Sequence, residues 1–469
     1  SRFELTGEEW TIRGSGPLVN LPAGPLALSA SAQRREDHIG DSVRTLPSTT
    51  NPNPSYDWNP AVGLNSWAYY AELHAPIFGR ESQLPLVRGL ELHASVRRDD
   101  FTMRTRADRS NLVVPSPDGP FPSVSLFDRK YQATKATLGL KYTMTEDLAL
   151  RASHGTGFLP PSLFQLSPGA PLTAPFNLSD PRRGNTGQVI NPPRLTGGDP
   201  AIEPEQSEST SAGLVFTPRF VPGLRLSFDY TRIVKTKEIG TIVVQTLVDL
   251  EDLFPDRIQR AALTTQDMAL GYTGGAITQI DLRNLNLAGK WIEAWDVQAD
   301  YTWKPAGWGE FQAYAIATWQ PHLETQFYAT SPRIETVGYS STVKLRANGG
   351  LTWSRGAWSL GWNAQYYGSY YVYSATSSAA QRATAELNQG SGTIPSQAYH
   401  DISASYRWGR NPDGWQRLLA ESQLTLGIQN VFNTSPPILA NTLPLSASTY
   451  SQLGDPRLRR FTISLRKKF

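Results

Sequence analysis

The sequence predicts an all-β fold, a transmembrane antiparallel β-barrel of about 15 strands, and three observations lead to this prediction. Apolar and polar residues alternate along many runs of the 469-residue chain. The connections between these runs switch between short turns and long loops. Tryptophan residues gather beside the short turns.

The alternating runs recur along the whole chain. They include residues 3–14, 26–33, 67–77, 90–97, 295–304, 343–354, 358–366 and 459–469. Because successive side chains of a strand point to opposite faces, each run gives its strand one apolar and one polar face. Most of these runs approach the ~9–11 residues that a tilted strand needs to cross a membrane, whereas strands of soluble sandwiches average ~5–6 residues.

The connections follow the pattern of outer-membrane barrels, with tight turns at one end and long loops at the other. Short turns fall at residues 21–24, 145–147, 218–223, 305–307 and 355–356, and long loops at 38–63, 104–129, 157–205, 237–284, 322–341, 374–395 and 433–456. Beside the short turns lie Trp303, Trp308, Trp353, Trp358, Trp408 and Trp415. We interpret them as an aromatic girdle at the periplasmic interface; the alternative is that they fill a soluble core.

Composition narrows the class of protein. No stretch of about 18 apolar residues occurs, which excludes a helical membrane span. Cysteine is absent, so neither a disulfide framework nor a thiolate metal site can form. The net charge of +3, from 44 basic and 41 acidic residues, is too balanced for a nucleic-acid partner. No shift in composition divides the chain, and we expect residues 1–469 to form one unit.

The strand count predicts that part of a barrel is missing. If the last strand ends in the periplasm, the short turns are periplasmic and the first strand, about residues 3–14, begins outside the cell. Complete single-chain bacterial barrels have an even number of strands, so an odd count with an external start predicts missing N-terminal strands. The first residues also lack the charged and apolar regions of a signal peptide.

Three segments resemble the TonB-dependent outer-membrane receptors. They are R-A-S-H-G-T-G-F-L-P-P-S at 151–162, G-D-P-A-I-E-P-E-Q-S-E at 198–208 and G-I-Q-N-V-F-N at 427–433. The terminal Phe469 agrees with the family, whereas Lys467 departs from its usual apolar or aromatic residue. The resemblance implies the C-terminal part of a barrel of about 22 strands, without its plug domain and N-terminal TonB box.

That resemblance also implies a function. It predicts a receptor in the outer membrane of a Gram-negative bacterium that imports a scarce nutrient, such as a siderophore or another metal chelate. Its implied partners are outer-membrane lipid, the TonB complex through the missing plug, and the barrel assembly machinery through the C-terminal strand. No cofactor is implied. Two alternatives stay open: a passive porin-like channel, and a barrel whose loops serve binding or adhesion.

The motif residues have a structural interpretation. We expect Gly155 and Gly157 to free the backbone where a strand leaves the membrane, and Pro160 to prevent the chain from pairing again. Pro204 should keep the returning segment extended before the next strand begins. The full set of structural motif residues is Gly155, Gly157, Phe158, Pro160, Pro204, Glu205, Asn430, Phe432 and Phe469.

Two groups of residues are candidate ligand sites. His74 and His93, with Glu72 and Glu91 beside them, fall on the polar faces of two strands joined by a short connection. Imidazole and carboxylate groups together bind Zn²⁺, although the same residues also suit a hydrated cluster in the lumen. Tyrosines of the loops after residues 322 and 366 are candidate ligand contacts or girdle residues; they are Tyr328, Tyr339, Tyr370, Tyr371 and Tyr373.

Other chemistry finds no support. The chain has no G-x-S-x-G nucleophile motif and no glycine-rich phosphate loop, so we expect a protein that is not an enzyme. Within the loop 237–284, the apolar spacing of residues 248–255 predicts a short helix.

Overall fold

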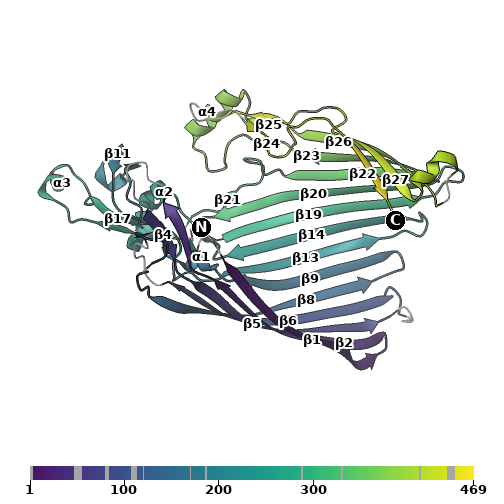
Figure 1. The fold of residues 1–469 in the computed structure, drawn as a ribbon, viewed down its shortest axis with the longest axis horizontal. Coiled ribbons are helices and arrows are strands. Elements are labelled where there is room, and N and C mark those ends of the chain that lie inside the picture. Colours follow the sequence, from purple (N-terminus) through teal and green to yellow (C-terminus); the bar gives the residue numbers. More distant parts are fainter. Residues whose placement is uncertain are drawn as a thin grey trace.

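The computed structural model describes residues 4–46, 55–79, 84–106, 113–119, 121–169, 171–184, 187–286, 289–328, 331–410, 413–440 and 449–468. Their main feature is one large, curved antiparallel sheet, with short turns at one end and long loops at the other (Figure 1). The two ends of the chain lie at opposite ends of this wall, the N-terminus beside the long loops.

The wall has fifteen strands in sequence order, and the short β21 (Ile334–Glu335) adds a sixteenth by pairing with β20. The fifteen are β1 (Leu5–Leu21), β2 (Gly24–Ile39), β5 (Val62–Phe78), β6 (Gly89–Arg106), β8 (Leu126–Thr143), β9 (Leu148–Leu159), β13 (Glu205–Phe216), β14 (Leu224–Thr236), β19 (Gly289–Trp303), β20 (Glu310–Gln326), β22 (Leu345–Arg355), β23 (Trp358–Tyr367), β26 (Gln397–Arg407), β27 (Ser422–Gln429) and β30 (Arg460–Lys467). The predicted fold class and strand count are confirmed.

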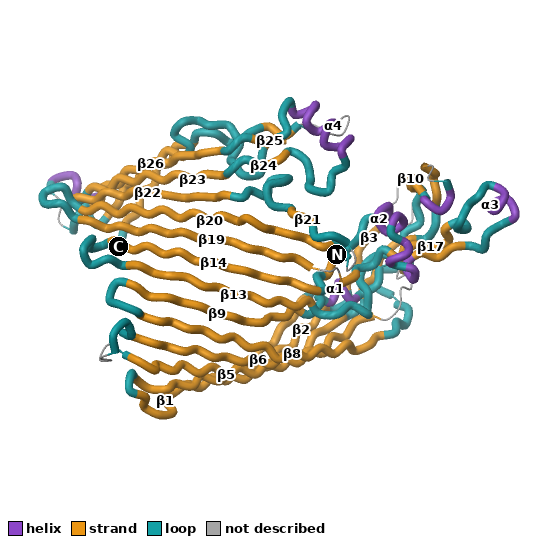
Figure 2. Tube along the Cα trace, turned by 180° about the vertical axis from the view of Figure 1, so that it is seen from behind, coloured by secondary structure: helices purple, strands orange, loops and turns teal. Residues whose placement is uncertain are grey.

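The wall is open at its two edges within the described part of the chain. There β1 pairs with β2 and β30 pairs with β27, and neither has a second partner. Figure 2 shows the resulting curved sheet from behind. No helix among the described residues is long and apolar enough to span a membrane.

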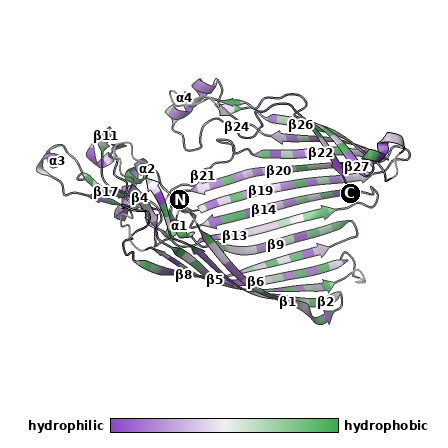
Figure 3. Cartoon of the chain, viewed as in Figure 1, coloured by the Kyte–Doolittle hydropathy of each residue, from purple (hydrophilic) through white to green (hydrophobic). Residues whose placement is uncertain are grey.

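The sheet has an apolar face and a polar face. On the apolar face, cross-strand register aligns Leu351 with Trp362, Trp362 with Ile402, Ile402 with Ile428, and Ile428 with Phe461. Trp362 is 44% exposed and Phe461 73% exposed. A row of large apolar side chains left open across five strands indicates a lipid-facing surface. The alternation is visible along the strands of Figure 3.

Aromatic side chains mark both ends of the apolar face. Near the short turns, Trp303 stacks on Phe311 with 5.0 Å between ring centroids, and Trp358 packs edge-on against Tyr406 at 4.9 Å. Farther from the short turns, at the middle of β19 and β14, Trp295 packs against Tyr230 at 4.6 Å. Trp295 and Trp303 are eight positions apart on β19, about 26 Å of strand and about 20 Å of height at the usual tilt. This spacing is close to the ~25 Å apolar band of outer-membrane barrels.

The short turns use glycine where the backbone requires it. Gly223 lies between β13 and β14 with a φ of +88°, which favours glycine. A Cβ atom at this position would also lie 2.0 Å from the carbonyl oxygen of Thr302 in the neighbouring strand β19. The predicted turn therefore depends on this one residue.

The long loops carry small elements of their own. The strands are β3 (Ser42–Leu46), β4 (Ser55–Asn59), β7 (Val113–Val114), β10 (Phe176–Ser179), β11 (Gly187–Ile190), β12 (Arg194–Leu195), β15 (Ile239–Gly240), β16 (Ile258–Arg260), β17 (Ile277–Asp281), β18 (Leu285–Asn286), β24 (Tyr370–Tyr371), β25 (Thr393–Ile394), β28 (Ile438–Leu439) and β29 (Thr449–Tyr450). The helices are α1 (Leu163–Leu166), α2 (Val244–Asp249), α3 (Thr265–Ala269) and α4 (Ala379–Gln389), with 3₁₀ turns at Pro181–Arg183, Glu251–Leu253, Pro255–Arg257 and Gly414–Leu419.

Several element boundaries differ from the predicted ones, and three of the differences concern the start or end of an expected element. The first strand extends to Leu21, beyond the expected end near residue 14. The helix expected at 248–255 begins earlier, as α2, and continues as two 3₁₀ turns. The strand expected from residue 343 begins at Leu345, because Val343 is buried in the core of the adjoining loops.

One substitution pair tests the assignment of the two faces. Leu351→Arg places a charge on the apolar face near the middle of β22, where it should cost about 2–4 kcal/mol in a lipid bilayer. Asn348→Arg, three residues earlier on the polar face, should have little effect. The measurement is the fraction of each variant that is folded in outer membranes, read from heat-dependent gel mobility. A larger loss for Asn348→Arg would show that the faces are inverted.

Candidate functional site

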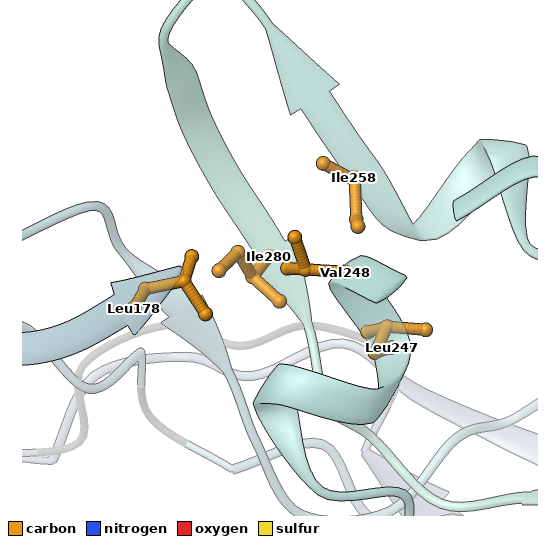
Figure 4. Close-up of a cluster of buried hydrophobic side chains, with 5 residues drawn as sticks. All are labelled: Leu178, Leu247, Val248, Ile258 and Ile280. Carbon is orange, nitrogen blue, oxygen red and sulfur yellow. The ribbon is translucent and has the colours of Figure 1, made fainter. Parts of the chain in front are cut away.

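Two long loops, 160–204 and 237–286, fold together at one end of the wall. β12 from the first loop pairs in parallel with β17 from the second, and β17 pairs with β16. Their common core, drawn in Figure 4, buries Leu178, Leu247, Val248, Ile258 and Ile280. We call this unit the loop domain.

Buried ion pairs join the parts of the loop domain. Arg260 Nη1 lies 2.7 Å from Asp180 Oδ2, and Arg260 Nη2 lies 2.6 Å from Glu251 Oε2. Burial works against the charge of Arg260, but the hydrogen bonds to Glu251 and Asp180 outweigh it and raise the pKa of the guanidinium. Because each charge is paired and hydrogen-bonded, the network specifies how the two loops meet.

The loop domain is anchored to the polar face of the wall. Leu163 and Leu166 of α1 pack with Met103 of β6 and Tyr131 of β8, which share a face with the charged residues of these strands. The Tyr131 hydroxyl donates to the carbonyl oxygen of Ile202 at 2.8 Å. The loops therefore fold over the polar side of the sheet.

The glycines of segment 151–162 serve the sheet differently from the expectation. Both lie inside β9, paired with β13, rather than at the exit from the strand. A Cβ at Gly157 would lie 2.6 Å from Ser207 Oγ, and one at Gly155 would lie 2.8 Å from Thr137 Oγ1. They make room for neighbouring strands. Phe158 packs against Phe101 at 5.8 Å.

Segment 198–208 fastens the loop domain to β13. The Asp199 amide donates to the carbonyl oxygen of Gln165, within α1, at 2.8 Å. Pro204 leads directly into Glu205, the first residue of β13. One carboxylate oxygen of Glu205 accepts the Ile239 amide at 2.9 Å, and the other lies 3.0 Å from Lys235 Nζ.

The motif at 427–433 ends a strand. Asn430 follows β27 with a φ of +51°, and its side chain bonds both the carbonyl and the amide of Thr434. Phe432 is 68% exposed and meets the ring of His400 edge-on. Both residues lie just beyond β27, which ends at Gln429. Phe469 lies outside the described residues.

Three of the five candidate tyrosines come together. The rings of Tyr339 and Tyr371 lie 4.9 Å apart, and those of Tyr371 and Tyr373 lie 5.3 Å apart. The guanidinium of Arg382, from α4, lies 5.4 Å from the centre of the Tyr373 ring. We call Tyr339, Tyr371 and Tyr373 the tyrosine cluster. Tyr371 is 41% exposed, so part of the cluster is open to solvent.

The other two tyrosines lie elsewhere. Tyr370 is 3% exposed, packs in the loop core with Val343 and Ile394, and bonds Ser451 Oγ at 3.1 Å. Burial removes it from the candidate contact surface. Tyr328 meets Phe254 edge-on at 5.9 Å, within reach of the loop domain.

The candidate metal ligands lie together on the polar face, near the short-turn end of β5 and β6. His74 pairs directly with His93, and their ring centroids are 4.4 Å apart. Glu91 Oε2 lies 3.4 Å from His74 Nε2, and Glu72 Oε1 lies 3.8 Å from His93 Nδ1. We call Glu72, His74, Glu91 and His93 the histidine cluster.

Sequence reasoning missed a second group of possible ligands, His322 and Glu324 on β20 and Glu335 on β21. The spacing of His322 and Glu324 places both on one face of a strand, which was a usable signal. Glu335 lies in a different short strand of the loop and carries no such signal.

The wall, its two faces and its long loops can now be compared with known proteins. A profile described as TonB dependent receptor-like, beta-barrel matches residues 2–431. The chain belongs to this family. A comparison with curated proteins gave no significant match.

Solved structures share the fold at low sequence identity. The chain is similar to a mutant of the ferric enterobactin receptor PfeA from Pseudomonas aeruginosa, with 14% identity, a TM-score of 0.53, and coverage of 99% of this chain and 62% of that one. For the siderophore receptor PirA from Acinetobacter baumannii the identity is 12% and the TM-score 0.52, with coverage of 98% of this chain and 62% of that one. For the copper transporter OprC the identity is 13% and the TM-score 0.51, with coverage of 92% of this chain and 52% of that one. The chain thus spans less than two thirds of the length of these structures.

The part of the loop domain around α3 should become less stable in acid. A hydrogen bond from Arg183 and further bonds from Thr264 lower the pKa of Asp267 from 3.8 to about 2. A carboxyl group whose pKa is lowered in the folded state stabilises that state at pH values above the ordinary pKa. This stability is lost as the pH falls through the lowered pKa. Cleavage of residues 255–282 by pepsin should therefore rise between pH 4 and pH 2.

Two variants separate this effect from general acid unfolding. Asp267→Asn should make the segment susceptible already at pH 4. Asp252→Asn removes a carboxylate whose side chain is 89% exposed and should change little. Equal cleavage of both variants at pH 4 would contradict the role of Asp267.

Proposed function

We propose that this chain forms the barrel of an outer-membrane receptor that imports a scarce nutrient as a metal chelate of the siderophore type, energised through TonB. The observation that carries the proposal is a sheet with one apolar and one polar face whose long loops fold over the polar side. Family membership supports it, because TonB-dependent receptors reside in the Gram-negative outer membrane. The proposed work is binding and passage, without bond chemistry.

The tyrosine cluster supports a planar aromatic ligand. Its stacked rings come from two different loops and are joined by the cation of Arg382, so aromatic faces and positive charge are available together. An anionic aromatic iron chelate would match both features. The neighbour PfeA has been solved in complex with enterobactin, which is consistent with this ligand class.

Partners follow from the same proposal. The apolar face would contact outer-membrane lipid. The barrel assembly machinery would recognise the C-terminal strand. TonB would act through a plug domain in the intact receptor. A passive porin-like channel and a loop-based adhesion barrel remain the alternatives that the experiments below separate.

Accessibility in cells tests the orientation. A tag inserted within residues 380–389 of α4 should be reached by antibody on intact cells, because α4 lies among the long loops (Figure 1). Tags at Gly307 or Gly356, in short turns, should be reached only after the outer membrane is opened. Equal labelling of all three sites on intact cells would overturn the orientation.

Uptake tests the function. Cells that carry the intact protein should accumulate iron from its catecholate chelate only when TonB is present. TonB-independent uptake would favour the porin, and no uptake with normal surface binding would favour the adhesion barrel.

Variants test the binding surface. Tyr371→Ala with Tyr373→Ala removes stacking worth about 0.5–1.5 kcal/mol per ring pair, and the Kd for the chelate should rise about tenfold. Tyr450→Ala is the matched control, since it removes an exposed loop tyrosine outside the tyrosine cluster. An unchanged Kd in the double variant would exclude the tyrosine cluster as the contact surface without excluding transport.

A further inference from the structure

We propose that the histidine cluster is a Zn²⁺ site on the polar face of the wall. The site does not depend on which substrate the receptor carries. Its two imidazoles, of His74 and His93, come from adjacent strands and stand directly opposite each other in the β5–β6 register. The two carboxylates lie on the diagonals, so that Glu91 reaches His74 and Glu72 reaches His93.

The distances suit a tetrahedral ion. A Zn²⁺ with ligands at about 2.0–2.1 Å holds neighbouring ligand atoms about 3.3 Å apart. The His74–Glu91 separation of 3.4 Å matches this spacing, and the His93–Glu72 separation of 3.8 Å is slightly longer. Ligand atoms of His74, Glu91 and His93 all lie within 4.8 Å of one another, whereas Glu72 lies outside this group and faces His93 alone of the three. Side-chain rotations would bring the first three to one ion, and a larger movement would add Glu72 as the fourth ligand.

Each carboxylate is held by a group that leaves one oxygen for the ion. Lys141 Nζ lies 2.7 Å from Glu91 Oε1, while Glu91 Oε2 faces His74. The Tyr70 hydroxyl donates to Glu72 Oε2 at 2.8 Å, while Glu72 Oε1 faces His93. Outer partners that orient ligating groups in this way are a general feature of metal sites.

Hydrogen bonds between the imidazoles and the carboxylates explain the arrangement less well than a bound metal ion does. Charge-assisted bonds between a cationic nitrogen and a carboxylate are about 2.7–2.9 Å long, and both imidazole–carboxylate separations exceed this. The two rings lie with their centroids 4.4 Å apart. A metal ion bound by the imidazoles and carboxylates would account for these separations.

The ligand types select the metal. Imidazole nitrogen with carboxylate oxygen suits Zn²⁺, whereas Ca²⁺ and Mg²⁺ prefer ligand sets made of oxygen alone. The side chains of His74 and His93 are 37% and 44% exposed, so an ion in the lumen can reach them.

The second group, around His322, is explained without a metal. His322 Nδ1 lies 2.9 Å from Glu335 Oε2, an ordinary hydrogen bond, and Glu335 Oε1 accepts the amides of Leu323 and Val337. Glu324 faces Arg333 at 3.7 Å. With one imidazole and satisfied carboxylates, this group makes the weaker site.

Calorimetric titration tests the proposal. The full-length protein, purified in detergent without a histidine tag and stripped with EDTA, is titrated with ZnSO₄ in a His322→Gln background that removes the second group. We expect one Zn²⁺ per chain, not displaced by millimolar Ca²⁺. His74→Gln and His93→Gln should each weaken binding by about 100-fold or more, and Tyr70→Phe, which only orients Glu72, by about tenfold.

The control is His154→Gln. His154 lies in the wall on β9, on the face opposite the histidine cluster, where it is paired in register with Leu138 and contacts Thr210 Oγ1 at 2.9 Å, so its loss should leave Zn²⁺ affinity unchanged. Heat-dependent gel mobility checks that each variant is folded. Absence of stoichiometric Zn²⁺ binding, or an equal loss in His154→Gln and His74→Gln, would overturn the proposal.

A measurement on the unmutated histidine cluster covers the case in which variants fail to fold. Zn²⁺ should protect His74 and His93, but not His154, from modification by diethylpyrocarbonate, as read by mass spectrometry of peptides. Replacement by Co²⁺ should give the intense visible absorption of a tetrahedral site. Equal modification of all three histidines with and without Zn²⁺ would refute the site.

Discussion

Backbone pairing between neighbouring strands is the constraint on which the rest of this structure depends. In hydrocarbon no water can satisfy a free N–H or C=O group, and each unpaired group costs several kcal/mol. Each strand of the wall is therefore paired with the next wall strand along the sequence, from β1 to β30. Register then decides which side chains meet lipid, because a slip of one residue would move the whole apolar row to the opposite face.

The loops are held by a different kind of interaction. The loops lack the apolar–polar alternation of the strands. The loop domain is held together instead by a small apolar core and buried Arg–carboxylate pairs. Arg260 joins segments 80 residues apart in sequence through Asp180. Such pairs confer geometry more than net stability, since burial of the charges offsets much of their attraction. The result is a folded surface at the long-loop end of the wall.

The two proposed sites lie at opposite ends of the wall and have different origins. The tyrosine cluster belongs to loops, which tolerate change and often carry recognition. The histidine cluster belongs to paired strands, whose register holds its imidazoles opposite each other. Identities of only 12–14% to structures with the same fold mean that the fold alone does not specify the function.

The sequence by itself determined the features that depend on residues close together in the chain. Alternation marked the strands, and short turns implied which strands are adjacent, so even the meeting of His74 and His93 across one connection was predictable. The sequence did not reveal that Tyr370 is buried while Tyr371 is exposed, nor that Glu335 reaches His322. Nor did it reveal that Gly155 and Gly157 lie opposite the hydroxyl groups of Thr137 and Ser207 in the neighbouring strands. Only the tertiary structure decided these points. They depend on contacts between segments that lie far apart in the sequence, and no local pattern of residues encodes such contacts.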